Sequence, residues 1–188
     1  MPSAPGVQSE NRTAGRTVQI MTNPIRYSLL IAGHNPAPQG SKRYAGHQYN
    51  AKAGRELPVL KEESARVGPW RDAVCGLAAA AKARQKLRAP LDGWLEASMV
   101  FIMRPSAKAA RELAKDPRSV LPDTRYYGDL DKLQRSTLDG LADAKVIADD
   151  ARVVSIQAVK VFPGFFPRLI HPGAYIRLRM LDTSTLAL

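Results

Sequence analysis

Two helical stretches, each followed by a stretch of alternating residues, constrain the fold of this chain more than any other feature of its sequence. The first runs from Pro69 to near Lys86, and its apolar residues recur at three- and four-residue steps: Trp70, Ala73, Val74, Leu77 and Ala81. The second runs from Asp129 to about Ala144, with an inner side made of Leu130, Leu133, Thr137, Leu138 and Leu141. Such periods predict amphipathic helices that bury one face.

Four segments have the composition or the alternation of β-strands. Residues 25–32 are mostly apolar, and residues 152–161 alternate between apolar and polar side chains. Residues 95–103 and 174–180 alternate as well, with one face made of Leu95, Ala97, Met99, Phe101 and Met103 in the first and of Ala174, Ile176, Leu178 and Met180 in the second. The order strand, helix, strand, helix, strand, strand predicts an α+β domain in which two main helices cover one face of a small mixed β-sheet.

The remaining segments lack such patterns. We expect a flexible N-terminal arm at residues 1–24, one domain at residues 25–182 and a C-terminal tail at residues 183–188. Residues 33–58 are rich in Gly, Pro and basic residues and are predicted to be a long basic loop. Residues 104–127 are predicted to be a second basic, irregular stretch.

The charge of the chain predicts a polyanionic partner. It has 28 Lys and Arg against 17 Asp and Glu, a net charge of +11, and basic side chains bind nucleic acid by releasing the counterions of its phosphates. A solvated basic surface is the alternative. The candidate phosphate contacts are Lys42, Arg43, Lys108, Arg111, Lys115, Arg118 and Lys132. The candidates for stacking on unpaired bases, or for packing, are Tyr44, Tyr126 and Tyr127.

Other features exclude several classes of protein. The single cysteine, Cys75, excludes an internal disulfide and a zinc ribbon, and the three histidines lack metal-ligand spacing. No apolar run reaches the length of a membrane span, and the N-terminus lacks the apolar core of a signal peptide. We therefore expect a cytoplasmic protein that contacts no membrane.

Acidic residues gather in the segment from Gly128 to Val154. Asp129 and Asp131 lie where the second helix begins, and Asp149 and Asp150 lie just before a strand. A site whose protein ligands are all carboxylates suits a hard cation such as Mg²⁺ or Mn²⁺. The helix between the two pairs is about 24 Å long, so the spacing leaves open whether they converge.

Each acid also has a structural interpretation. Asp129 is placed to cap the helix, and Asp149 and Asp150 are typical of a polar turn. Asp131, Arg135 and Asp139 are spaced by four and share one helical stripe, where Arg135 and Asp139 could form a surface ion pair or Arg135 could meet a phosphate. A D-x-D motif also occurs in metal-dependent glycosyltransferases, but the chain has no Gly-rich turn between strand and helix.

The two acidic motifs resemble a known family. DLDKLQRSTLDGL followed by DDARVVSIQAVK is similar to the signature of the RusA family of Holliday junction resolvases, which is common in phages and prophages. The similarity extends to the loop PAPQGSKR, to WRDAV and to PGAYIRL, and it covers residues 28 to 180 approximately.

The resemblance implies an Mg²⁺-dependent homodimer in a bacterial host cell that cuts four-way DNA junctions symmetrically during recombination and repair, without a nucleotide cofactor. It places the metal-binding acids at Asp129, Asp131 and Asp150. The basic catalytic position, usually lysine, falls on Arg135, and Lys132 stands where asparagine is frequent. Guanidinium keeps the charge of lysine but does not readily donate a proton. A DNA-binding protein of the same fold that cuts nothing remains the main alternative.

Overall fold

The computed structural model describes residues 25–40, 42–62 and 64–182, so the predicted arm at residues 1–24 and the tail at 183–188 lie outside the described residues. A four-stranded sheet contains β1 (Ile25–Ala32), β6 (Gly173–Met180), β4 (Leu95–Ile102) and β5 (Val153–Val161) in that order. β6 is antiparallel to both of its neighbours, and β4 and β5 are parallel. The sheet is therefore mixed, as predicted.

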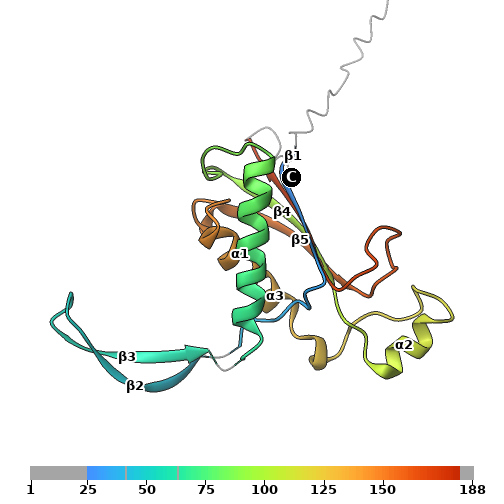
Figure 1. The fold of residues 1–188 in the computed structure, drawn as a ribbon, viewed down its shortest axis with the longest axis horizontal. Helices are drawn as coiled ribbons and strands as arrows, with labels where there is room; N and C mark the ends of the chain where they lie inside the picture. The colour runs from blue at the N-terminus through green and yellow to red at the C-terminus, as the bar shows by residue number, and fades with distance from the viewer. Residues whose placement is uncertain (1–24, 41, 63, 183–188) are drawn as a thin grey trace, which may run out of the picture.

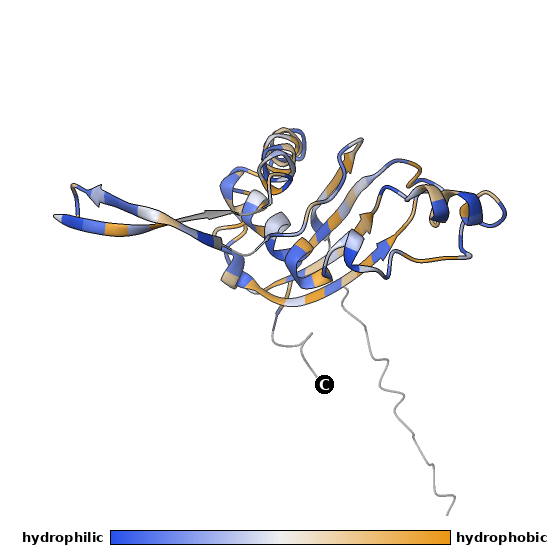
Figure 2. Cartoon of the chain, turned by 90° about the horizontal axis from the view of Figure 1, so that it is seen from below, coloured by the Kyte–Doolittle hydropathy of each residue, from blue (hydrophilic) through white to orange (hydrophobic). Residues whose placement is uncertain are grey.

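Two helices cover one face of this sheet (Figures 1 and 2). They are α1 (Val67–Arg84), which packs on β1, and α3 (Leu130–Asp143), which packs on β5. The helices approach each other closely at Gly140, where a Cβ atom would lie 2.8 Å from Cβ of Val74. Beside this contact, Nε1 of Trp70 donates a hydrogen bond of 3.2 Å to Oγ1 of Thr137. The α+β architecture predicted from the helix and strand patterns is thus confirmed.

The faces predicted from periodicity are the buried ones. In β4 the side chains of Leu95, Ala97, Met99 and Phe101 are all buried against the helices, as are Ala174, Ile176 and Leu178 of β6. No helix in the described part of the chain is both long enough and apolar enough to span a membrane.

The two edges of the sheet differ. On β1, the side-chain amide of Gln85 accepts a hydrogen bond from the Ser28 N–H (3.0 Å) and donates one to the Ser28 C=O (2.7 Å), so this edge is covered at its centre. On β5, the exposed apolar side chains of Val154 (53%), Ile156 (38%) and Val159 (39%) lie on the strand. No hydrogen bond from another described element covers the outer side of β5.

The prediction of a long loop at residues 33–58 is wrong for its second half. This part forms a hairpin of β2 (Lys42–Asn50) and β3 (Arg55–Glu62), which projects from the domain as an arm (Figure 1). Its turn is closed by Oδ1 of Asn50, which accepts a hydrogen bond of 3.0 Å from the Ala53 N–H. Since neither face of the arm packs on the domain, its strands lack the apolar alternation by which strands are recognised.

The stretch at residues 104–127 is also less irregular than predicted. It contains α2 (Ala107–Leu113), whose N-cap Ser106 accepts a hydrogen bond from the Ala109 N–H, and the 3-10 helix η1 (Arg125–Tyr127). None of the α2 residues is fully buried. A seven-residue helix without a buried face has no apolar period to reveal it.

Candidate active site

The start of α3 leaves the carboxylate of Asp129 available for binding. Asp129 occupies the N-cap position of the helix with an extended backbone, but its side chain makes no capping hydrogen bond. Its Oδ2 instead lies 3.1 Å from Nζ of Lys132, and 59% of the side chain is exposed. The structure therefore does not support the interpretation of Asp129 as a helix cap, and an exposed ion pair of this kind contributes little to stability.

Two other segments, the loop after β1 and the end of β5, hold this helix start in place. Gly128 has φ +76 and packs against the ring of Pro38, where a Cβ atom would lie 2.4 Å from Cγ, so only glycine fits this position. Its C=O accepts a hydrogen bond of 2.7 Å from Nζ of Lys160, at the end of β5. The loop that follows β1 is held by two further bonds, from Gln39 N–H to Lys132 C=O (3.1 Å) and from Ser136 Oγ to Ala37 C=O (2.7 Å).

A cavity of about 530 Å³ opens beside Asp129, where the loop after β1, the residues before α1 and the start of α3 meet. Its lining consists of Pro38, Gln39, Gly40, Ser64, Arg66, Arg125, Gly128, Asp129 and Lys132. Three cations and one carboxylate thus share a single opening, and cationic side chains beside a carboxylate suit a phosphate group that is bound together with a divalent ion.

Sequence reasoning did not single out three of these lining residues. Arg66 and Arg125 lie outside any motif, and only the fold places them beside Asp129. Gln39 lies in the loop PAPQGSKR, and its Oε1 is buried without a hydrogen-bond partner among the described residues. A buried acceptor of this kind is costly unless a ligand or water supplies a donor, which is a signal that no sequence pattern contains.

The polar stripe on α3 is divided between two environments. Asp131 and Arg135 are exposed to solvent. Asp139 instead faces α1, where its Oδ2 lies 3.5 Å from the guanidinium of Arg71, which also binds Asp143 at 2.8 Å. The hydrogen bond that Arg71 donates to the carboxylate of Asp143 raises the pKa of Arg71 above its usual range. The proposed Arg135–Asp139 pair is therefore replaced by a contact between the two helices.

The second acidic pair lies in the 3-10 helix η2 (Asp150–Arg152) and its N-cap. Oδ1 of Asp149 accepts a hydrogen bond of 2.8 Å from the Ala151 N–H, and this bond is the main reason why the pKa of Asp149 lies below its usual range. Asp149 thus has the polar-turn role that its position allows. Asp150 is exposed at the start of η2.

The two acidic pairs lie at opposite ends of the unit formed by α3 and β5. Asp129 begins α3 beside Lys160, near the end of β5, whereas Asp150 follows α3 and precedes the start of β5. A helix of 14 residues separates them by about 21 Å. Consistently, the described residues contain no group of three or more His, Cys, Asp or Glu that could hold a metal ion. One chain therefore does not assemble the three predicted metal-binding acids.

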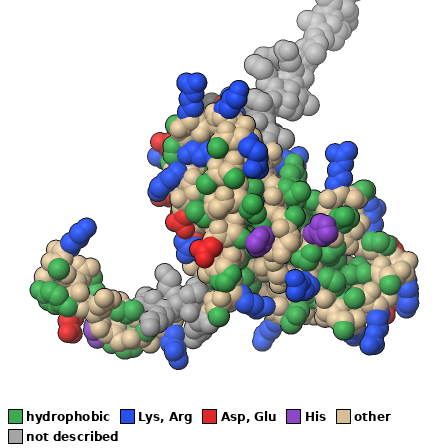
Figure 3. Space-filling view, in the orientation of Figure 1, with side chains coloured by type: hydrophobic (Ala, Val, Ile, Leu, Met, Phe, Trp, Pro, Cys, Tyr) green, Lys and Arg blue, Asp and Glu red, His purple; other side chains and the backbone are tan. Residues whose placement is uncertain are grey.

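The predicted DNA contacts lie mainly around α2 and on the arm, and Figure 3 shows basic side chains around the edge of the α2 region. Lys108 and Arg111 are exposed on α2, and Arg43 is exposed on the arm. Lys115 pairs with Glu112 at 3.3 Å. Arg118 has a structural contact, because its Nε donates to the Phe165 C=O at 3.3 Å. Lys42 begins β2.

The three candidate stacking tyrosines also differ. Tyr127 is buried, its ring packs edge-on against Phe162, and its hydroxyl accepts a hydrogen bond from the Ser106 N–H, so it has a packing role. Tyr44 (54% exposed) and Tyr126 (66% exposed) remain accessible.

Comparison with known families identifies the chain. The family model described as endodeoxyribonuclease RusA matches residues 35–170, which include the arm, both main helices and both acidic pairs. The chain belongs to the RusA endodeoxyribonuclease family. No curated protein matches the sequence. Membership in RusA assigns the chain to a family of nucleases rather than to the glycosyltransferases that share a D-x-D motif.

Proposed function

We propose that this RusA family member is an Mg²⁺-dependent endonuclease that resolves four-way DNA junctions by symmetric cuts in recombination and repair. The observation that carries this proposal is the uncapped carboxylate of Asp129 beside a basic cavity, in a chain that belongs to a nuclease family. The +11 charge supports a nucleic-acid substrate.

The acids fit a hard divalent ion by their chemistry. Asp129, Asp131 and Asp150 offer only carboxylate oxygens and are exposed, which suits Mg²⁺, with Mn²⁺ as a substitute. When bound, the ion would polarise the scissile phosphate and lower the pKa of an attacking water. Within one chain the set is incomplete, since Asp150 lies at the far end of α3.

A homodimer would complete the set. If two copies pair antiparallel through the uncovered edge of β5, the start of one β5 lies beside the end of the other. In each chain the end of β5 carries Lys160, which binds Gly128 at the start of α3. The pairing would therefore bring Asp150 of one copy toward Asp129 and Asp131 of the other, and it would bury the exposed Val154 and Ile156.

The chain's own residues would then have distinct roles in hydrolysis. Arg135 lies one turn along α3 from Asp131, and its guanidinium would stabilise negative charge on the phosphate without transferring a proton. Lys132, Arg66 and Arg125 line the cavity and would hold the phosphates on either side. Lys108 and Arg111 on α2 would fix the position of the DNA backbone and carry no sequence information.

The decisive experiment is cleavage of a labelled four-way junction, analysed on a gel with Mg²⁺ or with EDTA. We expect paired cuts at symmetric positions with Mg²⁺ and none with EDTA. A protein that binds the junction but leaves it intact under both conditions would be a DNA-binding protein without nuclease activity, and the proposal would be wrong.

Mixing two inactive variants tests whether the site is shared. Asp131→Asn and Asp150→Asn each inactivate their own homodimer, but in a mixed dimer one shared site carries both changes and the other is intact. Random exchange of subunits would then restore about a quarter of the wild-type cleavage, mainly as single nicks. If each site belonged to one chain, the mixture would stay inactive.

A further inference from the structure

The arm carries a row of aromatic side chains, two of which are largely exposed to solvent. Tyr44 and Tyr49 of β2 are 54% and 65% exposed. Between them lies His47, whose Nδ1 is 2.7 Å from the hydroxyl of Tyr44, with the two rings edge-on at 5.5 Å. Large exposed apolar side chains gathered on one small element indicate a binding surface.

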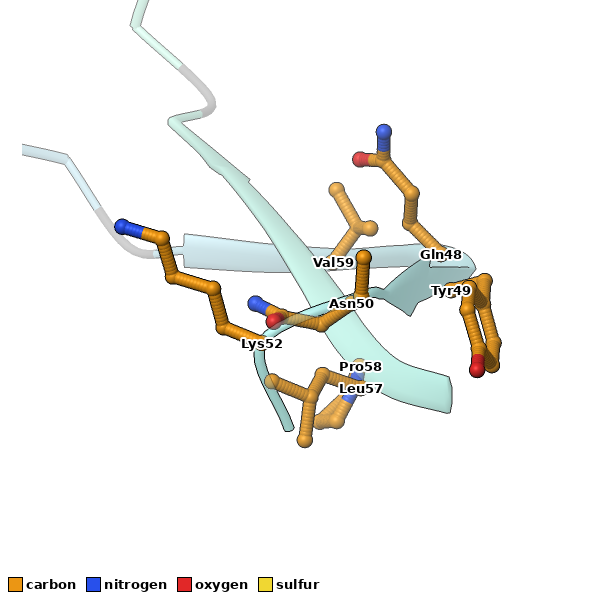
Figure 4. A pocket seen from close by; sticks show the side chains of 8 residues that line it. Gln48, Tyr49, Asn50, Lys52, Leu57, Pro58 and Val59 are labelled. Atoms are coloured by element: carbon orange, nitrogen blue, oxygen red, sulfur yellow. The ribbon is translucent and has the colours of Figure 1, made fainter. Parts of the chain in front are cut away.

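The three rings lie on one face of the hairpin. A β-bulge shifts the register between Tyr44 and His47, and the contact between these two side chains places them on the same side. Tyr49 follows His47 by two residues and so faces the same way. In Figure 4, Tyr49 and its neighbour Gln48 point to opposite sides of β2, as this alternation requires.

The spacing and charge of the arm suit unpaired bases. Rings two residues apart on a strand are separated by about 6.6 Å, which is about twice the 3.4 Å rise between stacked bases, so one base fits between them. Described residues 43–59 contain three cations, Arg43, Lys52 and Arg55, against the single acid Glu56. Aromatic rings beside basic side chains are typical of surfaces that bind single strands.

We propose that the arm binds nucleotides that are unpaired at the branch point, with Tyr44, His47 and Tyr49 as a stacking surface. This inference rests on the proposed function, because it assumes a branched DNA substrate. It assigns the hairpin a role that the acidic site does not have. The arm would recognise the open centre of the junction, whereas the site at α3 would cut a strand outside it.

The test uses the full chain in EDTA, so that binding is measured without cleavage. Three DNA probes are compared: a four-way junction with 2-aminopurine at the branch point, a single strand taken from one of its arms, and a linear duplex of the same sequence. Tyr49→Ala should weaken binding to the junction and to the single strand about 5- to 150-fold, the range for one stacked base, and should abolish quenching of the 2-aminopurine. Binding to the duplex should change less than about twofold, since no base is unpaired there.

Two control variants keep the outcomes distinct. Tyr49→Phe should restore quenching and affinity, and Gln48→Ala, on the opposite face of β2, should behave as wild type. Wild-type affinity in both Tyr44→Ala and Tyr49→Ala, or an equal loss on linear duplex, would overturn the inference. So would a change from dimer to monomer on sedimentation of Tyr49→Ala, because the row would then be a contact between subunits. Failure of the unaltered protein to bind any of the three DNAs would instead reject the proposed function.

Discussion

The main domain and the β2–β3 arm are held together in different ways. In the domain, Trp70 of α1 is 2% exposed and donates a hydrogen bond to Thr137 of α3, and the apolar side chains of one face of β4 and β6 are buried. In the arm, Tyr49 is 65% exposed, and the two strands contact mainly each other. An isolated two-stranded hairpin is only marginally stable in water. Buried contacts therefore account for the stability of the domain, whereas the arm is held mainly by the pairing of its own two strands.

The largest expected effect separates cutting from binding. Asp131→Asn removes a charged oxygen ligand from the proposed site, and we expect cleavage of the junction to fall on the order of 10³-fold or more. Affinity for the junction should stay the same or increase, because a negative charge is lost near the phosphates. Cleavage at the wild-type rate with Mg²⁺ would show that Asp131 is not part of the site.

A core substitution measures what holds the domain together. Trp70→Ala removes a buried ring and its hydrogen bond to Thr137, and we expect the free energy of unfolding to fall by about 3–5 kcal/mol. The matched variant Tyr49→Ala should change it by less than about 0.5 kcal/mol. Denaturant unfolding followed by circular dichroism measures both, and similar losses in the two variants would contradict the comparison.

A smaller effect depends on pH and again belongs to the domain. Tyr27 is fully buried, its hydroxyl donates a hydrogen bond of 3.0 Å to the Ala78 C=O, and burial raises its pKa to about 12. Since the unfolded chain has a tyrosine pKa of about 10, the neutral ring stabilises the fold fully below pH 10, and this stabilisation is lost as the pH rises to 12.

The expected loss is about 2 kcal/mol at pH 12 relative to pH 9, for this side chain alone. Tyr27→Phe keeps the ring but cannot ionise, so its stability should depend less on pH over the same range. Thermal unfolding at several alkaline pH values makes the comparison. Parallel curves for the variant and the wild type would show that Tyr27 ionises normally in the folded state.

The smallest expected effect on stability comes from removing the arm. If residues 44–59 are replaced by two glycines, the free energy of unfolding should change by less than about 0.5 kcal/mol, because the described strands of the arm contact mainly each other. The same variant should bind the junction more weakly than wild type. A large loss of stability would mean that the arm supports the domain.

The sequence predicts the helices and strands of the four-stranded sheet well, because residues that are buried on one face of an element recur with the period of that element. The four strands and two helices were found close to their observed positions, since residues such as Phe101 and Leu141 repeat with the period of their element. The arm was predicted as a loop because Gly46 and Pro58 interrupt it and no face is buried. Proline has no backbone N–H, but the outer side of a strand in a two-stranded ribbon needs no donor, so Pro58 fits there.

For the site, the sequence located the acids but not their arrangement. The availability of Asp129 depends on a side chain that turns toward Lys132 instead of capping the helix, and either conformation is compatible with the motif. The separation of Asp129 from Asp150 follows from the direction of α3 relative to β5, which spacing alone left open. Arg66 and Arg125 reach the cavity from other segments, so no local pattern could identify them.

If copies of the chain join through their sheets as proposed, the amide of Gln85 that covers Ser28 would limit how many can do so. If both outer strands were free, each added copy would offer a new free strand, and growth into fibres would have no natural end. With β1 obstructed, the proposed pairing of two β5 strands about a two-fold axis would use the uncovered edge of the four-stranded sheet in each copy and leave none of that described sheet for a third. One glutamine side chain would thereby favour a closed pair over an open polymer.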